Sequence, residues 1–383
     1  MNPMHLERRT FLTLMAAAPA AFSQKSSGQK LVYFGTYTRK TSKGIYVAKL
    51  DSATGKVSEP ELAAEVANPS FVTIHPNQKY LYAVSEMGGV APGGGTVTAF
   101  SIERPSGKLT KLNHAATKGT SPCHLNVDKT GRTLVVANYG SGSVAAFPVK
   151  ADGSLGEAAS FIQHKGSSVD KRRQMGPHAH SVNYSANNKY VIAADLGLDE
   201  VLVYKVDPAT ASLTPNDPPF TKVKAGGGPR HFAFHPKGKY AYVINEMGQA
   251  VTAFAWDANK GTLKEIQHIS TLPDGVTVAN NTTAEVVAHP SGKFLYGSNR
   301  GHNSIVVYSI GQDGKLTRVD NTPTQGEIPR GFTIDPSGKW MIVGNQNSDN
   351  VVIFSIDQGT GRLTPTGQQL KVEAAVCVRF ASL

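Results

Sequence analysis

The stretch GGGPRHFAFHPKGKYAYVINEMG, residues 226–248, contains two short apolar runs that are joined by a turn with proline and glycine. Apolar runs of this length, bounded by turn residues, are typical of β-strands. In an antiparallel strand pair, the start of the first strand lies beside the end of the second. The stretch therefore predicts that Arg230 and Glu246, which are 16 residues apart in the sequence, are neighbours in the fold.

The same pattern occurs six times along the chain. Its first position recurs at residues 69, 122, 179, 229, 283 and 329, at intervals of 46 to 57 residues. Two of the copies are NPSFVTIHPNQKYLYAVSE, from residue 68, and GPRHFAFHPKGKYAYVINE, from residue 228. A third strand-like run, such as GSVAAF, and a more variable fourth segment follow each copy. Four strands in a repeat of about 50 residues are typical of a β-propeller blade.

The two ends of the chain supply a seventh blade. The segments KLVYFGTYT, from residue 30, and KGIYVAKLD, from residue 43, provide its second and third strands, and the C-terminal AAVCVRF provides its first. A blade closed in this way leaves no open sheet edge. We therefore predict an all-β fold, a seven-bladed β-propeller whose last blade is closed by N- and C-terminal strands, forming one domain over residues 25–383.

The N-terminal segment is typical of an export signal. Arg8 and Arg9 precede an apolar run that is too short to span a bilayer, and the small residues APA at 18–20 follow it. Paired arginines followed by Thr-Phe-Leu resemble a twin-arginine signal. We expect residues 1–24 to direct the protein to the periplasm or outside the cell; without use of the signal, the protein is cytoplasmic.

Composition narrows the classes of partner. The net charge is +11, but the longest basic run is KRR at 171–173, which is too short for a nucleic-acid site. We interpret the charge as favouring solubility and the steering of an anionic substrate. We expect no nucleic-acid partner, no membrane insertion and a monomer. Cys123 and Cys377 lie in apolar runs, which predicts two buried free thiols.

Several tempting motifs belong to the repeat. Histidine or aspartate occupies one place in five inter-strand turns, at His75, Asp128, His235, His289 and Asp335. We interpret these as turn residues rather than metal ligands. The glycines at 226–228 lack the Gly-Lys-Ser/Thr ending of a phosphate loop. The PHAH motif at 177–180 could chelate a metal, but no third ligand can be named, so we expect no metal and no cofactor.

Charged side chains gather at one mouth of the predicted channel. The first strand of each blade lines that channel. Aligning the copies on their turns brings together Glu86, His124, His178, His180, Arg230, His231, Glu246, Glu285, Arg300 and Arg330. Such a set suits acid–base chemistry on an anionic substrate. In the structural alternative, Glu86 and Glu285 pair with arginines, and His124 and His231 hydrogen-bond to neighbouring blades.

These motifs resemble the lactonase family of seven-bladed propellers, which includes 6-phosphogluconolactonases and carboxy-cis,cis-muconate cyclases. The likeness covers nearly all of the chain beyond the signal and includes PHAHSV, SNRGHNSI and VCVRF. In the cyclase branch a His, two Arg and a Glu form the catalytic set. The resemblance implies that His180 (or His178), Arg230, Glu246 and Arg300 have this role here. The export signal departs from the family pattern, because 6-phosphogluconolactone arises in the cytosol.

The leading hypothesis is hydrolysis of a sugar-derived lactone. Glu246 or His180 is expected to act as general base on a water, and Arg230 and Arg300 to hold a phosphate or carboxylate and stabilise the oxyanion. The predicted substrate-binding residues are Glu86, His124, His178, His231 and Arg330. The sequence has no Gly-x-Ser-x-Gly elbow, so we expect no acyl-enzyme.

Two alternatives stay open at this point. The first is a lactonising cycloisomerase of the carboxymuconate type, in which the arginines grip carboxylates while a proton moves beside the ring. The second is an exported binding propeller without catalysis. The second alternative predicts exposed aromatic residues on the rim and tolerance of substitutions at the channel mouth.

Overall fold

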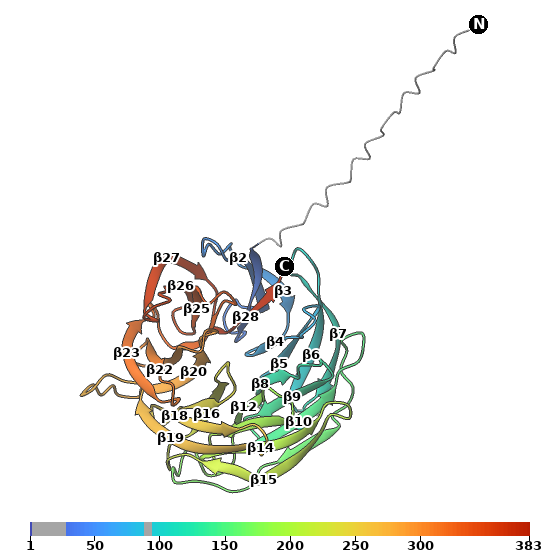
Figure 1. The fold of residues 1–383 in the computed structure, drawn as a ribbon. Coiled ribbons are helices and arrows are strands. Elements are labelled where there is room, and N and C mark those ends of the chain that lie inside the picture. The colour runs from blue at the N-terminus through green and yellow to red at the C-terminus, as the bar shows by residue number, and fades with distance from the viewer. Residues whose placement is uncertain (2–27, 88–93) are drawn as a thin grey trace.

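The computed structural model describes Met1 and residues 28–87 and 94–383. These residues form seven four-stranded antiparallel sheets, arranged radially as the blades of a propeller (Figure 1). The fold class predicted from the repeat is confirmed. The export signal expected at residues 1–24 lies, apart from Met1, outside the described residues. Within the described ranges, no helix is long and apolar enough to cross a membrane.

The blades are numbered here in chain order, with strands given from the inner to the outer one. Blades 1 to 3 contain β4 (Val72–Ile74), β5 (Tyr80–Ser85), β6 (Thr96–Ile102) and β7 (Leu109–Ala116); β8 (Pro122–Val127), β9 (Thr133–Asn138), β10 (Ser143–Pro148) and β11 (Ser160–Gln163); and β12 (Ala179–Tyr184), β13 (Tyr190–Asp195), β14 (Glu200–Asp207) and β15 (Ser212–Lys222). Blades 4 and 5 contain β16 (Pro229–Phe234), β17 (Tyr240–Asn245), β18 (Ala250–Asp257) and β19 (Thr262–Ser270); and β20 (Thr282–Ala288), β21 (Phe294–Arg300), β22 (Ser304–Ile310) and β23 (Leu316–Pro323). Blade 6 contains β24 (Pro329–Ile334), β25 (Trp340–Asn345), β26 (Asn350–Ile356) and β27 (Leu363–Lys371), and blade 7 contains β28 (Ala375–Ser382), β1 (Gln29–Thr36), β2 (Gly44–Asp51) and β3 (Glu61–Glu65).

Blade 7 joins the two ends of the chain. The C-terminal β28 pairs antiparallel with β1, with Phe34 opposite Val378 and Leu31 opposite Ala381. In Figure 1 the red β28 accordingly lies among the blue strands of the N-terminal region. This pairing closes the ring as the sequence predicted, and β1 is left without a free edge.

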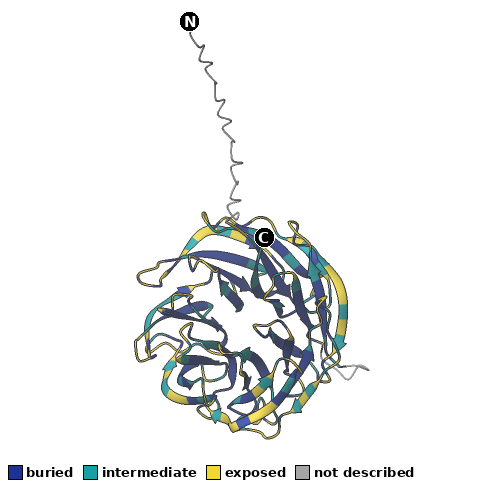
Figure 2. Ribbon diagram, turned by 45° about the vertical axis from the view of Figure 1, so that its right-hand side comes forward, coloured by how far each residue is buried: buried dark blue, intermediate teal, exposed yellow. Residues whose placement is uncertain are grey.

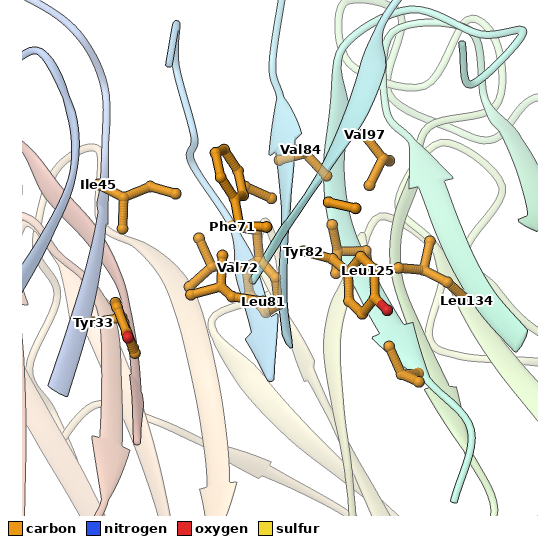
Figure 3. Packing of buried hydrophobic residues seen from close by; sticks show 14 of the residues in the cluster. Tyr33, Ile45, Phe71, Val72, Leu81, Tyr82, Val84, Val97, Leu125 and Leu134 are labelled. Carbon is orange, nitrogen blue, oxygen red and sulfur yellow. The ribbon is translucent and has the colours of Figure 1, made fainter. Parts of the chain in front are cut away.

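The core lies between adjacent blades. Figure 3 shows Tyr33, Phe71, Val72 and Tyr82 among the buried side chains where blades 7, 1 and 2 meet. Figure 2 shows the same division over the whole molecule, with the inner strands mostly buried and exposed residues mainly on outer strands and loops. Buried apolar area of this kind contributes about 25 cal/mol per Å² to folding.

Tyrosines in four second strands also join neighbouring blades. Each hydroxyl donates a hydrogen bond of 2.9 to 3.1 Å to the carbonyl of a glycine in the outer turn of the next blade, in the pairs Tyr33–Gly107, Tyr82–Gly153, Tyr242–Gly314 and Tyr296–Gly361. These contacts satisfy the buried hydroxyls, as a buried phenol requires.

The turn histidines have a similar structural role. In His75, His235 and His289, Nε2 bonds to the carbonyl of a turn glycine in the next blade at 2.8 to 2.9 Å. Their interpretation as turn residues is confirmed. Cys123 and Cys377 are buried and free, also as predicted.

The inner strands carry a recurrent irregularity that positions the site. In blade 4, Pro229 pairs with Asn245 and His231 with Ile244, so Arg230 is an extra residue, a β-bulge. The register shifts at the corresponding place in the inner strands of blades 2, 3, 5, 6 and 7. A bulge suspends the strict alternation of side chains between the two faces of a strand. Two consecutive residues of one strand can then contribute to the same site.

Candidate active site

The strand pairing predicted from the repeat brings Arg230 and Glu246 together. Glu246 directly follows β17, and its backbone N–H donates to the carbonyl of Gly228 at 2.7 Å. The equivalent bond in blade 3 joins Leu196 to His178 at 3.0 Å. Each blade therefore presents the end of its second strand beside the start of its first.

Glu246 is the centre of an ion-pair cluster. Its Oε1 accepts a hydrogen bond from Arg173 Nη2 at 2.8 Å. Its Oε2 accepts one from Arg230 Nε at 3.0 Å and lies 2.9 Å from Arg300 Nη2. Burial raises the pKa of Glu246, but Arg300, Arg230 and the nearby His180 outweigh burial and hold this pKa well below its usual value. The carboxylate is therefore ionised at neutral pH.

Two of the arginines are fixed from behind by backbone carbonyls. Arg230 Nη1 donates to the carbonyl of Ala284, and Arg300 Nη2 to that of Thr283, both at 2.6 Å. Their side chains are only 2% and 11% exposed. Burial lowers the pKa of Arg230 and lowers that of Arg300 to about 9, so Arg300 still carries its charge at neutral pH. The second strand pair, in blade 5, thus supplies both anchoring carbonyls.

His180 joins the same cluster. Its Nε2 lies 4.0 Å from Glu246 Oε2, and its Nδ1 lies 3.6 Å from the sulfur of Cys123. The ring is buried, and burial together with Arg230 lowers the pKa of His180 well below 6.5. His180 is consequently a neutral imidazole at neutral pH, and a distance of 4.0 Å leaves Nε2 without a hydrogen bond to the carboxylate.

A second group of buried rings adjoins His180. The ring centroid of His231 is 5.4 Å from that of His180 and 5.1 Å from that of His124. Nδ1 of His231 bonds to Oε1 of Glu285 at 2.8 Å. Burial lowers the pKa of both His124 and His231 and raises that of Glu285. Glu285 therefore orients a neutral His231.

The other predicted residues lie around this core. His178 stacks on Tyr139 at 4.6 Å, and its Nδ1 bonds to the carbonyl of Tyr139 at 2.9 Å. Glu86 accepts hydrogen bonds of 3.0 Å from the hydroxyl of Tyr37 and a further one from Ser70. The guanidinium of Arg330 lies 5.4 Å from the centroid of the same Tyr37 ring. Burial lowers the pKa of Arg330, but Tyr37 and Glu86 outweigh this effect and raise it.

Sequence reasoning missed four of the neighbours. Arg173 belongs to the KRR run, which was considered only as a polyanion site, and it lies on a connection that has no counterpart in the repeat. Tyr139 and Tyr37 were not selected because neutral residues carry no charge signal. Arg379, whose guanidinium lies 4.4 Å from the centroid of Phe71, is a cation in the otherwise apolar β28, and that contrast could have identified it.

The cluster has more positive than negative charge. The residues named above include five arginines (Arg173, Arg230, Arg300, Arg330 and Arg379) and three carboxylates (Glu86, Glu246 and Glu285). Even with every carboxylate ionised, two positive charges are in excess, because the buried imidazoles are neutral. In the part of the chain that the structure describes, no group of three or more His, Cys, Asp or Glu side chains is arranged to hold a metal ion. The arrangement suits binding of an anion.

Fold and cluster together define a seven-bladed β-propeller with a charged site on its inner strands. The family model described as "Lactonase, 7-bladed beta-propeller" matches residues 31–380, and the chain belongs to this family. It is 39% identical to a 6-phosphogluconolactonase of Bacillus subtilis, over 91% of this chain and 97% of the relative, and 37% identical to one of Formosa agariphila, over 90% and 97%. The structure of a periplasmic gluconolactonase of Pseudomonas aeruginosa matches with a TM-score of 0.87 and 34% identity, over 92% of this chain and 99% of that one.

Proposed function

We propose that the protein hydrolyses a lactone derived from a sugar acid, as relatives named 6-phosphogluconolactonase and gluconolactonase suggest. The observation that carries the proposal is the meeting of Arg230 and Arg300 at one oxygen of Glu246, with the neutral His180 4.0 Å from it. Cations, an ionised carboxylate and a free imidazole in one buried cluster are the groups that acyl transfer to water needs.

The pKa values favour His180 over Glu246 as general base. A carboxylate whose pKa is held well below its usual value is a weak base near neutral pH. His180 is neutral, and its Nε2 is turned toward Glu246. When His180 accepts a proton, the adjacent carboxylate stabilises the imidazolium. Glu246 is thus proposed to act as the electrostatic partner of the base and to orient the two arginines.

The proposed reaction proceeds without a covalent enzyme intermediate. The water oxygen bonds to the lactone carbonyl carbon while one of its protons passes to His180 Nε2. The carbonyl oxygen becomes an oxyanion, which Arg230 or Arg300 stabilises. The bond between that carbon and the ring oxygen then breaks, and the ring oxygen takes the proton back from His180. The product is the open-chain hydroxy acid, and no other reactant is required.

The remaining cluster residues are proposed to bind the substrate. His231, held by Glu285, and His124 offer neutral ring nitrogens for sugar hydroxyls. Glu86, His178 and Arg330 surround them with further polar groups. A polyhydroxylated ring is well matched by such a mixture of donors and acceptors.

The direct test is an assay of chain 25–383 with 6-phosphoglucono-δ-lactone, glucono-δ-lactone and a carboxymuconate. Hydrolysis of either sugar lactone faster than its spontaneous rate, and its loss in Glu246→Gln, is the expected result. Lactonisation of the muconate without hydrolysis of the sugar lactones would instead favour the cycloisomerase. Inertness toward all three, in wild type and variant alike, would favour the binding propeller.

A further inference from the structure

One arginine of the Glu246 cluster differs from the others in its origin. Arg230 and Arg300 project from β16 and β21, whereas Arg173 belongs to the connection between β11 and β12, residues 164–178. Its side chain is 41% exposed, against 2% and 11% for the other two. Arg173 is therefore the guanidinium that a solute meets from the solvent side.

The backbone beneath Arg173 is firmly held. Asp170 Oδ1 accepts hydrogen bonds from the N–H groups of Arg172 and Arg173 at 2.8 and 2.9 Å. The buried Gln174 donates through Nε2 to Asp199 Oδ1 at 2.8 Å and to the carbonyl of Leu196 at 2.9 Å. The loop therefore offers a fixed base from which only the long Arg173 side chain needs to move.

The contacts of Arg173 also leave donors free. Its Nη2 donates to Glu246 Oε1 at 2.8 Å and to the hydroxyl of Tyr139 at 3.1 Å. Among the residues that the structure describes, none accepts a hydrogen bond from Nε or Nη1 of Arg173. An arginine with unused donors at the edge of a positively charged cluster can bind a phosphate or carboxylate with two parallel hydrogen bonds.

The two oxygens of Glu246 separate the roles of its partners. Arg230 and Arg300 both contact Oε2, the oxygen that faces His180, whereas Arg173 contacts Oε1. If Arg173 leaves Oε1, the carboxylate still has two guanidinium partners and stays paired. Movement of Arg173 toward a ligand therefore does not leave an isolated buried charge.

We propose that Arg173 is the specificity-determining residue that binds the anionic group of the substrate, a phosphate or carboxylate remote from the lactone carbonyl, by exchanging its contact with Glu246 for the incoming anion. This inference rests on the proposed function, since it assigns the part of that site which distinguishes a charged lactone from a neutral one. The inner arginines remain with Glu246 and the reacting carbonyl.

The test compares wild type, Arg173→Gln, Arg173→Lys and the neighbouring Arg172→Gln as matched control. The kcat/KM values for 6-phosphoglucono-δ-lactone and glucono-δ-lactone give a preference ratio for each protein. Loss of a charge-assisted bidentate contact is expected to lower this ratio at least about tenfold in Arg173→Gln, with partial recovery in Arg173→Lys. Arg172→Gln should keep the wild-type ratio. An unchanged ratio in Arg173→Gln overturns the proposal.

Equilibrium binding separates this inference from the proposed function. Calorimetric titration with 6-phosphogluconate, glucarate and gluconate measures recognition of a phosphate, a second carboxylate and neither, without any turnover. Weaker binding of 6-phosphogluconate or glucarate to Arg173→Gln, with gluconate as the reference, supports the anion site and identifies its anion. Equal affinities of both proteins for all three acids contradict it. Absence of lactone hydrolysis by wild type would overturn the proposed function alone.

Discussion

Nε of Arg230 lies 3.0 Å from Oε2 of Glu246, although the two residues stand at the far ends of a strand pair whose other end is the HPKGK turn. The pair is buried, and Arg300 and Arg173 complete it. A buried ion pair of this kind is costly to break, because the remaining partner keeps its charge without compensation. Its retention in the blade that also carries His231 indicates a functional constraint, which substitutions can measure.

Glu246→Gln should lower the kcat for lactone hydrolysis at least about 100-fold, because His180 loses the carboxylate that stabilises its protonated form. Steady-state kinetics of chain 25–383 give the value. Gln346→Ala, at the same place after β25 of blade 6, is the matched control and should retain wild-type kcat. Wild-type turnover in a folded Glu246→Gln protein would remove Glu246 from the mechanism.

Arg230→Ala should lower kcat/KM at least about 100-fold, since the oxyanion loses a preorganised cation. Arg230→Lys should restore only a small part of this loss. A lysine ammonium cannot reproduce both the Nε contact with Glu246 and the Nη1 contact with the Ala284 carbonyl. The exposed Arg132→Ala serves as control for a change of net charge. Full recovery by lysine would mean that charge alone is required at this position.

The pH dependence of kcat/KM should report the depressed pKa of His180. A general base acts only when unprotonated, and burial and Arg230 lower this pKa well below 6.5. The activity should therefore be level from about pH 6.5 to 8 and fall only at more acid pH. A pH–rate profile of wild type, with His178→Asn as comparison, measures the acid limb. An acid limb centred at or above pH 6.5 would contradict His180 as the base.

The three buried imidazoles should also make stability depend on pH. The pKa values of His124, His180 and His231 are lowered by burial in the folded state, so below about pH 6.5 the unfolded chain binds more protons. Acidification from pH 6.5 should therefore reduce the free energy of unfolding, by up to about 1.4 kcal/mol per pH unit for each imidazole. Urea titrations of wild type and His124→Asn test this, and the variant should show a shallower slope. Identical slopes would contradict the assignment for His124.

Export is the remaining proposal about the whole chain. We propose that residues 1–24 act as a twin-arginine signal, so that replacing Arg8 and Arg9 by lysine should retain the protein in the cytoplasm. Fractionation of cells that express the full chain, with Glu7→Gln as the adjacent control, measures this. Equal amounts of periplasmic protein from the lysine variant and wild type would exclude the twin-arginine route.

The repeat made the fold and the centre of the site predictable. Strand pairing within a blade is local, so the spacing between Arg230 and Glu246 was sufficient to place them together. The closing of blade 7 by β28 followed from the same counting. The contact of Arg173 with Glu246 did not, because an irregular loop has no repeat equivalent from which its position could be inferred. The choice between Glu246 and His180 as base also depends on burial and neighbouring charges, which sequence spacing does not contain.

The bulge near the start of the inner strands has a consequence for how such a site can change. Because the extra residue is accommodated within one strand, the dipeptide at that step, such as Arg230-His231, can be exchanged without moving the register of the other sheets. The ring therefore offers a set of separately replaceable residue pairs, one for each bulged strand. Libraries that randomise one dipeptide at a time should retune which lactones are accepted while the interfaces between blades, and the melting temperature with them, stay nearly constant.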